Sequence, residues 1–157
     1  MRISLTIVLA TSICLSFGHA KVFEHAKKCE HSKNTFCCVK YVRNYDGDTI
    51  TVNINDVHSL LGTSISVRVA GIDTPEIKTK NKCEKRKAIL ARDLVKNLLA
   101  DADRIDLINI KRGKYFRIVA DVIINGSTNI KNVLLKKGLA YEYDGGKKQK
   151  IDWCKNK

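Results

Sequence analysis

The sequence is poor in proline, in aromatic residues and in acidic residues. Its 157 residues include one Pro and nine Gly, 6% are aromatic, and 16 Asp and Glu stand against 29 Lys and Arg. So little Pro and Gly excludes collagen-like and low-complexity chains, and a hydrophobic fraction of 44% excludes a wholly disordered one. The length leaves room for one domain.

The shortage of acidic residues gives the chain a formal net charge of +13. A strongly basic protein attracts polyanions because its summed field raises their local concentration. Nucleic acid, an anionic surface or an acidic polymer is therefore the expected type of partner.

Long hydrophobic runs are confined to the N-terminus. A basic start at Arg2 is followed by a mostly apolar run over Ile3–Phe17, and small residues surround a potential cleavage point after Ala20. This layout predicts a signal peptide over residues 1–20 and an exported protein, periplasmic or secreted. The alternative is a membrane anchor, but the run is short for a span of about 20 residues.

Five cysteines remain once Cys14 leaves with the leader. In an oxidising compartment they are expected to form disulfides, and the odd number leaves one thiol free or paired with another molecule. The sequence alone does not fix the pairing. A zinc cluster of His25, Cys29, His31, Cys37 and Cys38 is the alternative, although its spacing fits no common zinc finger. The five cysteines are Cys29, Cys37, Cys38, Cys83 and Cys154.

Alternation of polar and apolar residues predicts strands over Thr49–Asn55 and Ile65–Val69. Two further segments, Arg104–Ile110 and Tyr115–Ile124, also read as strands, and Asn125-Gly126 is a strong hairpin turn.

Helical spacing of apolar residues predicts a helix over about Cys83–Ala100, capped by Asn81 with Glu84 as its reciprocal partner. A shorter helix over about Asn129–Lys137 should stop at Gly138. Strands and helices in this order suggest a short barrel with helices packed on it, with an OB-like barrel as one option.

Acidic and basic motifs fall at the ends of the predicted strands. Asp46-Gly47-Asp48-Thr49 precedes one strand, Asp73-Thr74-Pro75-Glu76 follows the next, and Arg68 and Arg117 lie on strands. Each alone is typical of a turn, a loop or a solvated side chain. Together, oxygen ligands suit a hard cation such as Ca²⁺ or Mg²⁺, and paired guanidinium groups suit a phosphate.

These motifs occur in a specific order, followed by Lys136-Lys137-Gly138-Leu139-Ala140. The set resembles the staphylococcal-nuclease-like (thermonuclease) family, in its exported bacterial branch, over roughly Val42 to Tyr143. The resemblance implies an α+β fold, a five-stranded OB-fold β-barrel with packed α-helices. It divides the mature chain into an N-terminal Cys-bearing arm, residues 21–40, and a nuclease domain, residues 41–157.

The resemblance also implies roles for individual residues. Asp48 and Asp73 match calcium ligands, and Thr74 matches a further ligand through its backbone carbonyl. Glu76 matches the general base that activates water. Asp46 matches a carboxylate that lies behind the metal ligands. Lys114 and Tyr115 match positions that contact the nucleotide.

Arg68 and Arg117 match the two phosphate-binding arginines of the family. The implied activity is a calcium-dependent hydrolysis of DNA and RNA with little sequence preference, which cuts the bond to the 5′ oxygen and leaves 3′-phosphate ends. A monomer is expected. The alternatives are a non-catalytic OB module that binds nucleic acid or another polyanion, which would not need to keep these residues, and an envelope structural or inhibitor protein.

The chain departs from the family pattern at several places. Phe116 stands where the family often has Gly, the stretch Ile77–Lys82 is short, and the long C-terminal helix of the type member is absent. We expect a Cys83–Cys154 disulfide to pin the short tail in its place, and Cys29 to pair with Cys37 or Cys38.

Two further features stay open. Tyr141 and Tyr143 are expected either to stack on a base or to pack in the protein. The lysine runs, Lys147-Lys148-Gln149-Lys150 among them, are expected to be a solvated surface, a field that attracts nucleic acid, or both.

Overall fold

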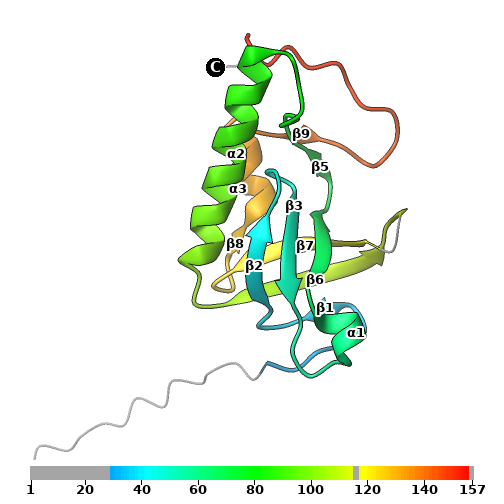
Figure 1. Ribbon diagram of the computed structural model, residues 1–157. Helices are drawn as coiled ribbons and strands as arrows, with labels where there is room; N and C mark the ends of the chain where they lie inside the picture. Colours follow the sequence, from blue (N-terminus) through cyan, green and yellow to red (C-terminus); the bar gives the residue numbers. More distant parts are fainter. Residues whose placement is uncertain (1–28, 115–116, 156–157) are drawn as a thin grey trace, which may run out of the picture.

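The computed structural model describes residues 29–114 and 117–155, so the expected leader over residues 1–20 lies outside the described residues. A mixed sheet is covered at one end by two helices (Figure 1). The elements in chain order are β1 (Thr35–Phe36), β2 (Lys40–Asn44), β3 (Thr49–Asn53), α1 (Ser59–Gly62), β4 (Ile65–Val69), β5 (Ile72–Asp73), α2 (Lys82–Ala100), β6 (Ile105–Arg112), β7 (Ile118–Ile124), β8 (Thr128–Asn129), α3 (Ile130–Lys136) and β9 (Tyr141–Glu142).

The main sheet curls into a small barrel. Its strand order is β1-β6-β7-β4-β3-β2, with β8 beside β7, and β4 and β7 are its parallel pair. The two sides of the sheet meet where the N–H of Val39, next to β2, donates to the carbonyl oxygen of Ile105 on β6 at 2.9 Å. Strands β2, β3, β4, β7 and β6 form the wall. The expected α+β class with an OB-like barrel is confirmed.

The alternation predicted for the strands fills the barrel with apolar side chains. Ile50 and Val52 of β3 and Val67 and Val69 of β4 are almost fully buried, while Arg68 lies on the other face of β4. A strand places successive side chains on opposite faces, so this one pattern supplies both the core and the site. Helix α2 closes the core with its buried residues Ala88, Ala91, Val95 and Leu99.

Helix α2 begins as predicted, but its second cap contact differs. The side chain of Asn81 accepts hydrogen bonds from the backbone N–H groups of Cys83 and Glu84. The carboxylate of Glu84 does not return to Asn81; it accepts instead from the hydroxyl of Thr79 at 2.6 Å and from the N–H of Glu76 at 3.3 Å. The reciprocal partner predicted for the cap therefore ties down the loop that carries Glu76.

Left-handed backbone explains the two predicted chain reversals. Asn125 and Gly126 have φ angles of 50° and 73°, and they join β7 to β8. Gly138, with a φ of 61°, follows α3. Strand β6 runs two residues further than predicted, to Arg112, and β7 begins at Ile118 rather than at Tyr115. Between them, the N–H of Gly113 donates to the carbonyl of Arg117 and closes a turn. Tyr115 and Phe116 lie outside the described residues.

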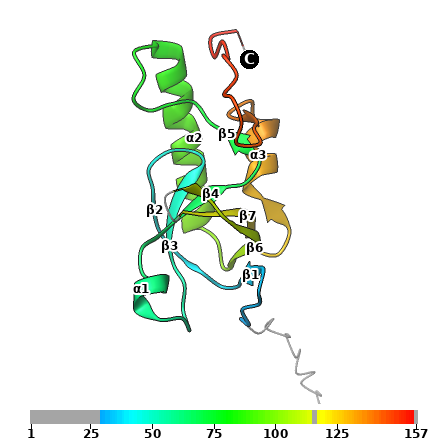
Figure 2. The same cartoon turned by 90° about the vertical axis from the view of Figure 1, so that its right-hand side faces the viewer.

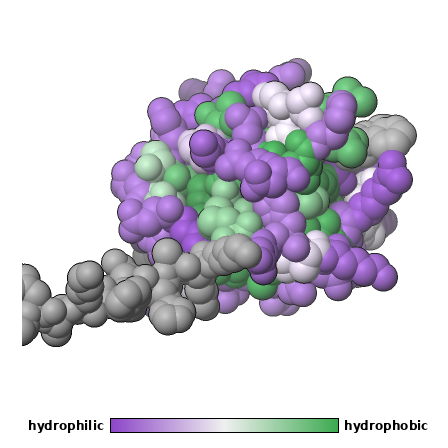
Figure 3. Space-filling model, turned by 90° about the horizontal axis from the view of Figure 1, so that it is seen from below, coloured by the Kyte–Doolittle hydropathy of each residue, from purple (hydrophilic) through white to green (hydrophobic). Residues whose placement is uncertain are grey.

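The described part of the N-terminal arm belongs to the sheet, because β1 pairs with β6. Helix α1 lies at the same end of the molecule, and its Leu60 and Leu61 are exposed. From below, the surface shows apolar residues scattered among polar ones (Figure 3). Within residues 29–114 and 117–155, no helix has the length and apolar character needed to cross a membrane.

The C-terminal segment lies at the opposite end from α1 (Figure 2). It begins with β9, which pairs with β5 through Asp73 and Tyr141. Beyond β9 the described chain forms a loop without a helix and returns to the start of α2, where Cys154 bonds to Cys83 (Figure 1). The Cys83–Cys154 disulfide that we expect to pin the tail is confirmed.

Candidate active site

A tight turn between β2 and β3 presents the first acidic motif. Asp46 accepts hydrogen bonds from the N–H groups of Asp48 and Thr49, at 3.2 and 2.7 Å. Its carboxylate thus shapes the turn from within, as Asp side chains commonly do. Asn44 fixes the turn to α2, since its amide donates to the carbonyl oxygens of Asp46 and Arg92, both at 2.9 Å.

Gly47 is required in this turn because of packing. A Cβ atom at this position would lie 2.8 Å from the Cβ of Ala91 on α2 and 3.0 Å from the Cγ2 of Thr74. The turn therefore sits directly against the helix, and this close approach places Asp48 in the interior.

Arg68 joins the two acidic motifs. Its Nη1 lies 2.8 Å from Oδ1 of Asp48, and its Nη2 lies 2.6 Å from Oδ1 of Asp73. Both carboxylates are buried, at 2% and 4% exposure. The sheet register produces this meeting, because Arg68 is the β4 partner of Thr49, the residue after Asp48. Asp73 follows five residues later, at the end of β5.

The pKa of Asp48 is raised to about 7, first by burial and then by the charges of Asp46 and Asp73, against the opposing effect of Arg68. The second oxygen of Asp48 accepts from the N–H of Thr74 at 3.1 Å. Burial lowers the pKa of Arg68, but its carboxylate partners, Asp48 first, outweigh this and leave it raised. The site thus holds more negative charge than Arg68 alone offsets.

The second oxygen of Asp73 has two partners from the C-terminal segment. The hydroxyl of Tyr141 donates to Oδ2 at 2.9 Å, and Nζ of Lys148 lies 3.1 Å from the same atom. Burial, then the contact with Asp73, raises the pKa of Tyr141 to about 12. Tyr141 also packs against Trp153, so it serves the site and the core of the tail together.

Glu76 lies at the open side of the site, with its side chain 57% exposed. Its Oε1 is 2.7 Å from Nζ of Lys148, which links it to Asp73 through one ammonium group. Burial lowers the pKa of Lys148, but the two carboxylates, Glu76 first, raise it overall. The residues border a cavity of about 270 Å³.

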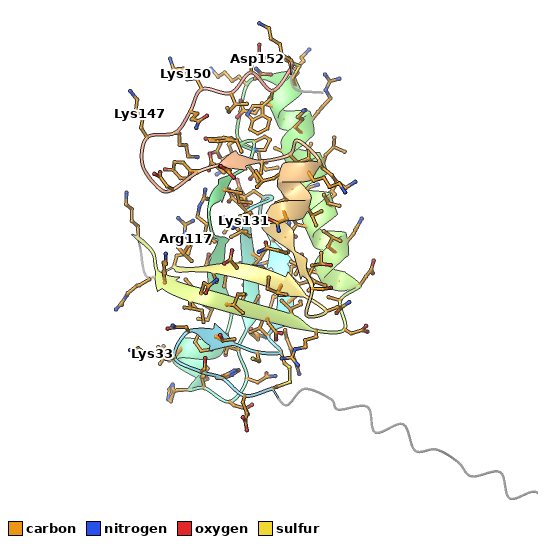
Figure 4. The ribbon with its side chains drawn as sticks, turned by 180° about the vertical axis from the view of Figure 1, so that it is seen from behind. Lys33, Arg117, Lys131, Lys147, Lys150 and Asp152 are labelled. Atoms are coloured by element: carbon orange, nitrogen blue, oxygen red, sulfur yellow. A yellow bond between two sulfur atoms is a disulfide. The ribbon has the colours of Figure 1, made fainter. Side chains whose placement is uncertain are left out.

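Arg117 lies just before β7, at a position in line with the face of the sheet that carries Arg68. In the parallel pair of β4 and β7, Arg68 is opposite Val119, and Arg117 is two residues before Val119. Residues two apart on a strand share a face, so we expect Arg117, which immediately precedes β7, to present its guanidinium on the side that carries Arg68. Figure 4 shows Arg117 at the end of β7, below the loop that carries Lys147.

Lys114 is exposed beside Arg117, whose N–H donates to its carbonyl oxygen at 3.3 Å. Tyr115, the other residue expected to contact the nucleotide, lies outside the described residues. Tyr143 lies on the other side of the site, with its ring centroid 6.0 Å from the guanidinium carbon of Arg68.

The described cysteines form two disulfides, Cys83–Cys154 and Cys29–Cys38, and Cys37 remains a thiol. This selects Cys38 from the two partners that the sequence left open for Cys29. Disulfide formation takes Cys29 and Cys38 out of the alternative zinc cluster. No group of three or more His, Cys, Asp and Glu suited to a metal occurs within the described ranges.

The expected calcium ligands include a backbone carbonyl, that of Thr74, besides the carboxylates of Asp48 and Asp73. Both carboxylates contact one guanidinium, so they lie close together. Oxygen donors with excess negative charge are the type of site that a hard divalent cation occupies. The residues present therefore fit such a cation, with two carboxylates as its charged ligands.

Tyr141 and Lys148 are site residues whose contacts the sequence did not predict. The sequence predicts only that Tyr141 stacks on a base or packs in the protein. It predicts that the lysine run containing Lys148 is a solvated surface, a source of attraction for nucleic acid, or both. Only the pairing of β5 with β9 and the return of the tail to α2 bring them to Asp73.

A comparison with known families identifies the family to which the chain belongs. A family model described as staphylococcal nuclease homologue matches residues 66–155, more than half of the chain. The match includes Arg68, Asp73, Glu76 and Arg117, while Asp48 precedes it. A search of curated proteins gave no match. The family is of nuclease type. The chain belongs to the staphylococcal nuclease homologue family.

Proposed function

We propose that this protein is an exported, calcium-dependent nuclease that hydrolyses phosphodiester bonds of DNA and RNA with little sequence preference. Membership of a nuclease-type family supports the class of reaction. The observation that carries the proposal is the guanidinium of Arg68 held between the buried carboxylates of Asp48 and Asp73. This arrangement supports the proposal, because a guanidinium can bind a phosphate and the neighbouring carboxylates can ligate a metal.

Arg68 and Arg117 are proposed to bind the phosphate that is cut. A phosphodiester carries negative charge, and more charge develops on its oxygens in the transition state. A guanidinium presents several N–H donors in a plane and pairs well with phosphate oxygens. The shared sheet face of the two arginines supports their action on one phosphate.

Glu76 is proposed to be the general base. Its exposed carboxylate takes a proton from water while the water oxygen bonds to phosphorus. The bond from phosphorus to the 5′ oxygen breaks, that oxygen takes a proton from solvent, and the product keeps a 3′-phosphate.

Asp48, Asp73 and the backbone carbonyl of Thr74 are proposed to hold the calcium ion, with Asp46 shaping the turn behind them. When bound, calcium supplies positive charge that offsets the charge of the phosphate. The closeness of the two carboxylates, which contact one guanidinium, supports this assignment, because a hard divalent cation prefers such oxygen ligands.

The nucleotide next to the cut is proposed to lie beside Tyr143. A cavity of about 620 Å³ opens there, lined by Gly71, Lys111 and Lys131 among others. Aromatic rings stack on any base, and lysines attract the backbone without reading sequence. Lys114, and Tyr115 by resemblance, extend this surface. Such contacts suit an enzyme with little sequence preference.

Export is proposed from the N-terminal sequence and is supported by the cysteines. Two disulfides, Cys29–Cys38 and Cys83–Cys154, are the kind of bond that persists in an oxidising compartment.

Digestion of a plasmid and of an RNA tests the proposed function. We expect the mature protein to cut both with calcium, to stop with chelator, and to leave 3′-phosphate ends on a labelled oligonucleotide. Glu76→Gln should lose the activity, while Glu142→Gln, an exposed residue on β9, should keep it. Binding without cutting under every condition would instead favour a non-catalytic OB module.

A further inference from the structure

Lys148 holds an unusual position for a residue in an exposed lysine run. Its ammonium nitrogen lies 3.1 Å from Oδ2 of Asp73 and 2.7 Å from Oε1 of Glu76. The side chain is only half exposed. The positive charge of Lys148 is therefore shared between two carboxylates, that of Asp73, a proposed metal ligand, and that of Glu76, the proposed general base.

The segment that carries Lys148, residues 143–154, is held at both ends, and we call it the C-terminal strap. At its start, the N–H of Tyr143 donates to the carbonyl of Gly71 at 3.0 Å. At its end, Trp153 is buried and Cys154 is bonded to Cys83 (Figure 1). The strap is thus tied across the site and keeps Lys148 within reach of Asp73.

The ammonium group of Lys148, next to the carboxylate of Asp73, opposes the binding of a metal cation to that carboxylate. Like charges repel, and the repulsion between a divalent ion and a lysine a few ångströms away is large even when solvent screens it. Lys148 also occupies one oxygen of Asp73 directly. Calcium can use that oxygen only if the ammonium moves away from it.

We propose that Lys148 is a built-in competitor of the divalent cation, which lowers the affinity of the Asp48–Asp73 site for calcium. The inference rests on the proposed function for the identity of the metal. A calcium site of low affinity would suit an exported protein, because extracellular calcium sites have dissociation constants of about 10⁻⁴–10⁻³ M. The strap then sets the metal affinity, while Asp48 and Asp73 provide the ligands.

The neighbouring lysines supply a matched control. Lys147 and Lys150 lie in the same strap and carry the same charge, but Figure 4 shows both directed outward from the loop. A change at Lys147 alters the net charge of the molecule as a change at Lys148 does, without altering the contacts of Asp73 and Glu76.

Isothermal titration of the metal-free mature protein with calcium chloride tests the proposal. We expect Lys148→Gln to bind calcium about tenfold more tightly than wild type. Lys148→Arg keeps the charge and should bind as wild type does, and Lys147→Gln should do the same. Circular dichroism confirms that each variant is folded.

The outcomes separate this inference from the proposed function. If wild type and Lys148→Gln bind calcium equally, or if Lys147→Gln has the same effect as Lys148→Gln, Lys148 is not a competitor although the nuclease can still be correct. If neither wild type nor Lys148→Gln binds calcium, the metal of the proposed function is wrong and the inference is overturned with it.

Discussion

At the residue scale, the site depends on the planar shape of one guanidinium. Arg68 uses two nitrogens to contact Asp48 and Asp73. Lysine has one nitrogen at the end of a flexible stem and cannot present two donors in a fixed plane. We expect Arg68→Lys to lower the rate of DNA cleavage on the order of 10²-fold, as loss of one preorganised donor does in other enzymes.

The control for this change is Arg92→Lys. The guanidinium of Arg92 pairs with its half-exposed neighbour Asp93, and its contact with Asn44 is made by the backbone carbonyl, which lysine keeps, so the change should cause no loss of rate. Initial rates on denatured DNA compare the two variants. Wild-type turnover by Arg68→Lys would contradict the role given to Arg68.

The buried carboxylate of Asp48 makes stability depend on pH. Its pKa is about 7 in the fold against 3.8 for an ordinary exposed Asp side chain, mainly because it is buried. The folded protein therefore holds this proton more tightly than the unfolded chain does. The resulting stabilisation is complete below pH 3.8, declines as pH rises, and is lost above about pH 7.

Asp48→Asn keeps a neutral side chain at every pH and should remove this dependence. In chelator, we expect its melting temperature to exceed that of wild type by about 5 °C or more at pH 8, and by little at pH 4. Asp152→Asn, at an exposed position, should give a small difference at both pH values. If the difference in melting temperature between Asp48→Asn and wild type were smaller at pH 8 than at pH 4, the raised pKa given to Asp48 would be contradicted.

At the element scale, the turn before β3 is fitted to helix α2 through Gly47. Because an added Cβ would lie 2.8 Å from Ala91, we expect Gly47→Ala to lower the free energy of unfolding by about 1–3 kcal/mol. Gly126→Ala is the comparison, since Gly126 has positive φ but nothing within 4 Å, and should cost about 1 kcal/mol. Urea unfolding measures both, and a smaller loss for Gly47→Ala would be inconsistent with crowding.

The two disulfides close loops of very different length. The cysteines of Cys83–Cys154 are 71 residues apart, and those of Cys29–Cys38 are nine apart. If restriction of the unfolded chain dominates, replacing the first pair by alanine costs about 4 kcal/mol and replacing the second about 2–3 kcal/mol. Urea unfolding of the two double variants tests the order, and a larger loss for the short loop would contradict it.

The sequence predicts those parts of the site that adjacent elements bring together. Asp48, Arg68 and Asp73 lie near consecutive strand ends, so their convergence follows from the pairing of neighbouring strands. Lys148 reaches the same site from 75 residues beyond Asp73, because β9 pairs with β5 and Cys154 bonds to Cys83. No local pattern encodes that return, and a lysine run reads as surface wherever it occurs.

At the scale of the whole molecule, the sequence pattern predicts α2, α3, β3, β4, β6 and β7, because each buried face repeats at the spacing of its element. It does not predict β2 or the one-turn helix α1. The two-residue strands β1, β5, β8 and β9 are too short to show a period, and they form only because they pair with neighbouring strands. Yet β5 and β9 form the edge that carries Asp73 and Tyr141. The OB-fold barrel is predicted by the family resemblance, whereas the order of strands and helices alone gives an OB-like barrel only as one possible fold.

The central claim is that the residues around Arg68 cut a phosphodiester bond rather than only bind nucleic acid. The most direct measurement is the single-turnover cleavage rate of single-stranded DNA by wild type and Glu76→Gln in calcium, with the dissociation constant for DNA measured alongside. We predict cleavage by wild type, and for Glu76→Gln a rate lower by about 10²-fold or more with DNA affinity changed only a few-fold. Tight binding by both proteins with no cleavage by wild type, or equal cleavage by both, would contradict the claim.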